Sequence, residues 1–174
     1  MYIACIDLNG NRYEGTLDFY VLKEVQKTLK KLNRDLKIHE IFHALADEDM
    51  QVISCLILHS LVRKGNCIEN INKDYTVSKN DEELIDYFIN INSFLIELLD
   101  ECMPKEEKES ESEFEDIPDF SGHSDWDLTY MEYLWTTILK RENFWNITPK
   151  NFFEQVDIHL KINSNEKKEK YEEI

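Results

Sequence analysis

The stretch from Pro104 to His123 constrains the fold most, because it is too polar to belong to a packed core. It is rich in Glu, Lys and Ser. The formal charges of residues 101–125 sum to −8, which is half of the net charge of −16 carried by the 174 residues. Such a segment buries too little apolar surface to offset the entropy of ordering its backbone. The sequence therefore predicts a first domain over 1–103, an acidic flexible linker over 104–123 and a small module beyond. The linker contains three large apolar residues: Phe114, Ile117 and Phe120.

The first domain opens with the pattern of a β-hairpin. Residues 3–8 and 12–17 have the alternating character of strands, and Asn9-Gly10-Asn11 separates them. Asn-Gly is the strongest short hairpin signal, because both residues tolerate a positive φ. A lone hairpin is marginally stable, so we expect it to pack on helices.

Helical periodicity follows the hairpin. Apolar residues recur at steps of three or four over 19–32 and 38–45, and 50–63 is almost wholly apolar. We expect a loop through Tyr75, then a long helix capped by Ser78. Its predicted buried stripe consists of Leu84, Ile85, Phe88, Ile91, Leu95, Leu98 and Leu99. The predicted fold class is α+β and predominantly helical, with an N-terminal β-hairpin packed on about four helices.

The module over 124–163 is predicted to be a small helical hairpin, followed by a frayed charged tail over 164–174. One helix covers 126–139, and Thr148-Pro149 is typical of an N-cap followed by a first-turn proline. All three tryptophans lie in the last 50 residues. A unit of about 40 residues rarely folds unaided, so the module either packs on the first domain or completes its folding on a partner. Its aromatic residues are either partner contacts or its own core. The candidate contacts are Tyr133, Trp135, Phe144, Trp145, Phe152 and Phe153.

His39-Glu40-Ile41-Phe42-His43 matches the H-E-x-x-H pattern of zinc peptidases. On a helix the two imidazoles could share a zinc ion, with Glu40 as base for the bound water. His59 and Glu69 are candidate third ligands, and Cys55 with His59 could complete a structural site. A five-letter pattern is weak, however, and the apolar residues around it are those of a core-facing helix. We predict no metal, no cofactor and no catalysis, with a small zinc metallopeptidase using His39, Glu40 and His43 as the alternative.

Other classes are disfavoured by composition. There is no basic patch for nucleic acid, no glycine-rich phosphate loop and no apolar run of the length a membrane span needs. The four cysteines are scattered without a C-x-x-C pair, which favours a cytoplasmic protein with free thiols. The acidic charge leaves a second alternative, an inhibitor that mimics DNA.

The segment from Met131 to Trp135, with Phe144-Trp145-Asn146-Ile147-Thr148-Pro149 and the following Phe152-Phe153, resembles the carboxy-terminal module of phage tail assembly chaperones. The order of predicted elements is similar over most of the chain, but the shared motif comprises only about ten residues. H-E-x-x-H is no part of the family pattern. The resemblance implies a non-enzymatic protein of the host cell cytoplasm. The first domain would coat the tape-measure protein, the aromatic module would recruit tail-tube subunits, and homo-oligomerisation is left open.

Overall fold

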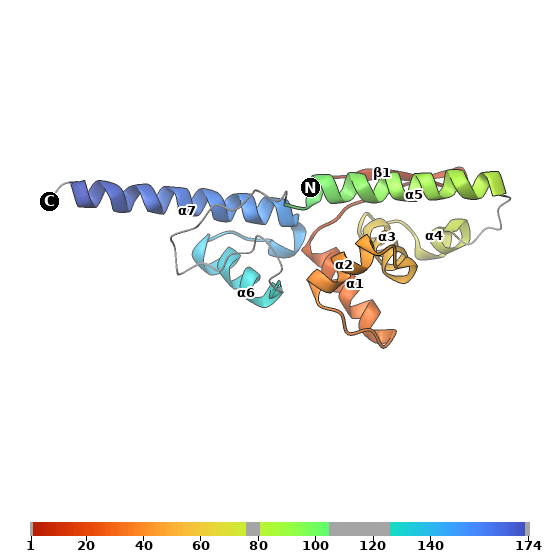
Figure 1. Cartoon of the computed structure of the whole chain (residues 1–174), viewed down its shortest axis with the longest axis horizontal. Coiled ribbons are helices and arrows are strands. Elements are labelled where there is room, and N and C mark those ends of the chain that lie inside the picture. The colour runs from red at the N-terminus through yellow and green to blue at the C-terminus, as the bar shows by residue number, and fades with distance from the viewer. Residues whose placement is uncertain (1, 76–80, 105–125, 173–174) are drawn as a thin grey trace.

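The computed structural model describes residues 2–75, 81–104 and 126–172 (Figure 1). In these ranges an N-terminal antiparallel hairpin precedes seven α-helices and two short turns of helix. This confirms the predicted α+β, predominantly helical class. The predicted linker lies outside the described residues, apart from Pro104.

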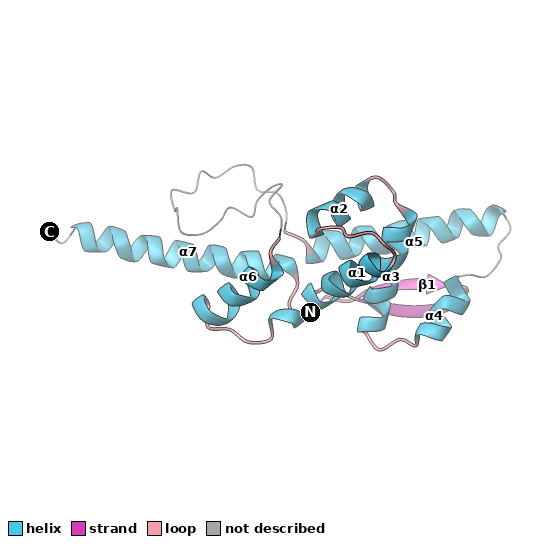
Figure 2. Cartoon of the chain, turned by 90° about the horizontal axis from the view of Figure 1, so that it is seen from below, coloured by secondary structure: helices cyan, strands magenta, loops and turns pink. Residues whose placement is uncertain are grey.

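The hairpin forms as its sequence predicts. Strands β1 (Ala4–Leu8) and β2 (Asn11–Gly15) pair in the register that joins Ala4 to Gly15 and Leu8 to Asn11. Both turn residues have positive φ, 50° at Asn9 and 75° at Gly10. Helix α5 (Asp81–Cys102) packs along β1, and α3 (Met50–Arg63) packs against β2 (Figure 2).

Gly15 allows α5 to approach the hairpin closely. A Cβ atom built at this position would lie 2.5 Å from Cζ of Phe94 and 3.1 Å from Cδ2 of Leu61. Because cores are packed as densely as organic crystals, no larger residue fits there unless the Phe94 ring and the Leu61 side chain shift.

The first three helices confirm the predicted spans, and carboxylates begin each of them. Asp18 accepts a hydrogen bond from the Val21 amide at the start of α1 (Phe19–Lys31). Glu40 accepts one from the Lys37 amide at the start of α2 (Ile38–Ala46), and Asp49 caps α3. These side chains satisfy amide groups that the first helical turn leaves without partners.

The predicted loop through Tyr75 is wrong, because residues Ile68–Tyr75 form helix α4. Ile71 and Asp74 are buried there, and the Asp74 carboxylate accepts hydrogen bonds from the Tyr13 hydroxyl and the Asn11 amide. Eight residues with few apolar positions give too short a pattern to reveal a helix. Hydrogen bonds from Asn11 and Tyr13 of the hairpin to Asp74 stabilise this helix, which its own apolar pattern does not predict.

The predicted buried stripe of α5 is also partly wrong. Its C-terminal half buries Ile91, Phe94, Leu95, Leu98 and Cys102. In its N-terminal half, however, Leu84, Ile85 and Phe88 are exposed. In Figure 1 the first turns of α5 extend past the end of the hairpin, so the described elements cover only part of this helix. The predicted Ser78 cap lies outside the described residues.

The C-terminal part contains α6 (Leu128–Tyr133), which continues as a π-helical turn over Leu134–Ile138. A 3-10 turn at Phe144–Asn146 leads to α7 (Pro149–Glu172). The Thr148 hydroxyl accepts a hydrogen bond from the Asn151 amide, which confirms the predicted cap. The expected fraying of the charged tail is not seen up to Glu172, since Lys and Glu are good helix formers. In both views α7 runs away from the rest of the chain (Figures 1 and 2).

Candidate protein-interaction site

The aromatic module packs against the start of α1. The Phe19 ring stacks on Phe144 with 4.4 Å between centroids, and it meets Phe152 edge-on at 5.8 Å and Trp126 at 6.3 Å. Phe19, Phe144 and Phe152 are buried. Offset and edge-to-face pairs at these distances add stabilisation beyond the buried area. We call these four rings the Phe19 cluster, and it joins the first and last parts of the chain.

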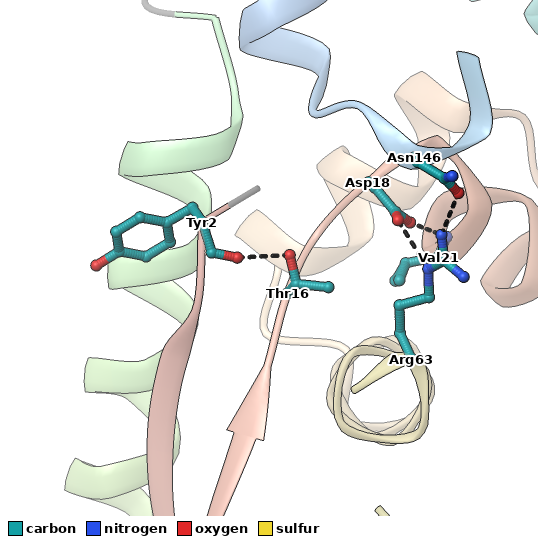
Figure 3. Close-up of polar contacts among 6 residues, drawn as sticks. All are labelled: Tyr2, Thr16, Asp18, Val21, Arg63 and Asn146. Carbon is teal, nitrogen blue, oxygen red and sulfur yellow. Dashed lines mark hydrogen bonds and ion pairs between the residues drawn. The ribbon is translucent and has the colours of Figure 1, made fainter. Parts of the chain in front are cut away.

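Polar contacts surround this junction. The Phe19 amide donates to the Ile147 carbonyl at 3.2 Å. Arg63, at the end of α3, donates from Nε to the Asp18 carboxylate at 2.8 Å and from Nη2 to the Asn146 side-chain oxygen at 2.6 Å (Figure 3). Of the two alternatives for the small module, the structure shows the one in which it packs back onto the first domain.

The six candidate contact residues therefore divide into two groups. Trp135, Phe144 and Phe152 are buried within the chain, and the Trp135 indole donates to the Glu142 carbonyl at 2.9 Å. A partner cannot reach these three rings in this conformation. Trp145, Phe153 and Tyr133 keep some accessible surface, and Tyr133 is 51% exposed.

Trp145 illustrates the half-buried group. Its indole donates to the Glu132 carboxylate at 2.8 Å, and the Lys23 ammonium lies 4.0 Å from its ring centroid. A cation over an indole face is attracted by the ring quadrupole. Partner contact stays a prediction for Tyr133, Trp145 and Phe153.

Sequence reasoning missed a second apolar surface, on α5. Ile85, Ile89 and Ile96 are exposed by 61%, 55% and 67%, and we call them the α5 isoleucine face. Two further exposed isoleucines, Ile158 and Ile162, lie on α7. The spacing of Ile85, Ile89 and Ile96 would have revealed the face, had the second apolar stripe of α5 been considered beside the buried one.

The histidine pair lies on α2, at the border of an open depression. The His39 and His43 ring centroids are 6.3 Å apart and their planes are nearly perpendicular. Glu40, the base of the zinc hypothesis, instead accepts a hydrogen bond from the Lys37 amide at 2.7 Å and so caps its own helix. The depression is lined by Arg34, His39, Glu40, His43, Ala44, Asp47 and Asp49.

The proposed further ligands lie elsewhere. His59 Nε2 is 2.8 Å from the Thr28 hydroxyl between α3 and α1, and burial lowers the pKa of His59. Glu69 accepts from the Cys67 thiol, and burial raises the pKa of Cys55, which disfavours the thiolate that binds metal. In the described ranges, no three or more His, Cys, Asp or Glu side chains are grouped to hold a metal.

We expect the purified chain, dialysed against zinc and then against buffer, to retain far less than one zinc ion per chain. Two imidazoles without a third ligand hold zinc weakly. The measurement is metal analysis of the wild-type chain and of His43→Ala. Stoichiometric zinc that is lost in His43→Ala would restore the peptidase alternative.

Among the described residues, no helix is both long enough and apolar enough to cross a membrane. Comparison with models of known protein families, with curated proteins and with solved structures gives no match for this chain. Its function must therefore be argued from its own surfaces.

Proposed function

We propose that this chain is a non-enzymatic tail assembly chaperone of a phage or prophage, acting in the host cell cytoplasm. It binds the tape-measure protein through its first domain and recruits tail-tube subunits through its C-terminal aromatic surface. The observation that supports this most is the exposure of apolar side chains on both parts of the chain. Ile85, Ile89 and Ile96 represent the first surface, and Tyr133 the second.

A client of this kind suits a helical surface. The resemblance implies a long helical client, and such helices present repeated apolar stripes that need cover before assembly. A helix docks its apolar stripe against an apolar surface, using residues spaced by three or four positions. Exposed isoleucines on a regular helix offer that kind of surface.

The junction at the Phe19 cluster shapes how the two surfaces would cooperate. Because Arg63 bridges Asp18 and Asn146, the C-terminal surface is held against the first domain in this conformation. Two binding surfaces on one body hold their ligands at a high effective concentration. The proposal therefore does not require a freely hanging module.

Co-expression tests the proposal. We expect a tape-measure protein encoded beside this chain to become soluble and to co-purify with it, because its apolar stripes would be covered. The measurement is the soluble fraction of the client with and without the chain, with Tyr133→Ala as a variant expected to keep the client soluble but to lose tail-tube protein. A client that stays insoluble and unbound would contradict the proposal.

A further inference from the structure

We infer that the α5 isoleucine face docks a partner helix whose apolar stripe is bordered by Lys or Arg. The inference rests on the proposed function in one respect, which is that the partner helix would be part of the tape-measure client. It names the face that binds and the charge the partner must carry.

The geometry of the face suits a helix. Positions 85, 89 and 96 fall within roughly 40° of arc around an α-helix, so the three side chains form one straight stripe. From the first to the last the stripe measures about 16 Å, which is three turns. Each isoleucine is more than half exposed, and no described element covers the stripe. A partner helix of four or five turns would lie along it and bury all three.

The charges on α5 are of one sign. From Asp81 to Cys102 the sequence contains seven Asp and Glu residues and no Lys, Arg or His. Asp86 and Glu97 directly follow Ile85 and Ile96, so both carboxylates fall on the same border of the stripe. The Tyr2 hydroxyl donates to Glu97, and the Lys150 ammonium lies 3.7 Å from Glu101. Complementary charge along a border sets the choice and orientation of a partner, which here calls for cations.

The same charges argue against two other occupants. A second copy docking through this face would bring two rows of carboxylates together, and like charges across an interface are costly. The chain's own residues 105–125 contain nine Asp and Glu against two Lys, so they carry the same sign as α5. A basic amphipathic helix is the occupant that meets both the apolar stripe and its acidic border.

The test uses the full chain and two synthetic peptides of about 18 residues, enough for five helical turns. Both have a leucine stripe, with lysine on the polar face of one and glutamate on that of the other. We expect the lysine peptide to bind at least about ten-fold more tightly in fluorescence anisotropy, with affinity falling as salt rises. Equal affinity of the two peptides would overturn the inference.

Non-specific attraction to a chain of charge −16 must be separated from docking. The double variant Ile89→Ser, Ile96→Ser removes apolar surface without changing charge. We expect it to lower the affinity for the lysine peptide about ten-fold or more. The matched control Ile158→Ser, Ile162→Ser alters two exposed isoleucines of α7 and should bind like the wild type. Unchanged affinity in the first double variant, or equal losses in both, would overturn the inference.

The remaining outcomes identify other occupants. A wild-type dimer that the Ile89→Ser, Ile96→Ser variant abolishes in sedimentation would assign the face to a second copy and refute the inference. A ten-fold gain in peptide affinity on deleting residues 105–125 would assign it to the chain's own acidic segment and likewise refute it. If a tape-measure client co-purifies while the lysine peptide fails to bind, the inference falls and the chaperone function stands.

Discussion

Replacing Phe144 by alanine is expected to lower the free energy of unfolding by about 3–5 kcal/mol. The ring is buried, stacks on Phe19 at 4.4 Å and meets Phe152 edge-on at 6.0 Å between centroids. Its removal leaves a cavity at the junction between the first domain and the C-terminal module. The measurement is urea unfolding followed by tryptophan fluorescence and by far-ultraviolet circular dichroism.

The two probes report different parts of the chain. All three tryptophans lie in the C-terminal part, whereas circular dichroism follows every helix. One cooperative body gives coincident transitions for the wild type. Tyr133→Ala is the matched control, because its ring is half exposed, and its cost should stay within about 0.5 kcal/mol. A Phe144→Ala chain as stable as this control would contradict the packing described here.

Asp18→Ala is expected to cost about 3 kcal/mol of stability. The carboxylate is fully buried, caps α1 through the Val21 amide and pairs with Arg63 at 2.8 Å. Removing one member of a buried pair leaves the other charge without compensation, and the lost cap adds about 1 kcal/mol. Arg63 keeps a quarter of its side chain exposed, so the loss should fall at the lower end of the range for buried pairs. The measurement is the shift of the urea midpoint at constant slope.

Two further variants separate the contributions. Asp18→Asn keeps an acceptor for the Val21 amide but loses the charge, so its cost should be intermediate. Asp35→Ala removes an acid whose pair with Lys30 is exposed on both sides, and its effect should be within about 1 kcal/mol. If Asp18→Ala costs no more than Asp35→Ala, the cap of α1 and the buried pair with Arg63 do not contribute the stability expected of them.

The elements predicted correctly from sequence are those whose signals are local. The hairpin follows from Asn9-Gly10, and α1 to α3 follow from apolar periodicity between capping carboxylates. The elements that sequence reasoning misjudged depend on contacts far along the chain. Helix α4 needs the hairpin turn, and the buried part of α5 is decided by where β1 ends.

The candidate site shows the same division. The small size of the tryptophan-rich module predicted that it packs on the first domain or on a partner, but the sequence did not show that the contact is with α1. Phe19 looked like one residue of a periodic helix, and only the folded chain shows it in contact with three other aromatic rings. The buried stripe predicted for α5 includes Ile85, which is exposed, and omits Phe94, which is buried, because sequence alone does not tell which apolar stripe of a helix is covered.

The order of synthesis gives the placement of Phe19 a further consequence. Its ring leaves the ribosome well before Phe144 and Phe152, and at common translation rates the delay is on the order of 10 s. Throughout that interval the nascent polypeptide displays an apolar ring whose three aromatic neighbours do not yet exist. A chain terminated before residue 126 would never gain these three neighbours. We therefore expect premature termination to yield a fragment that aggregates and is degraded quickly.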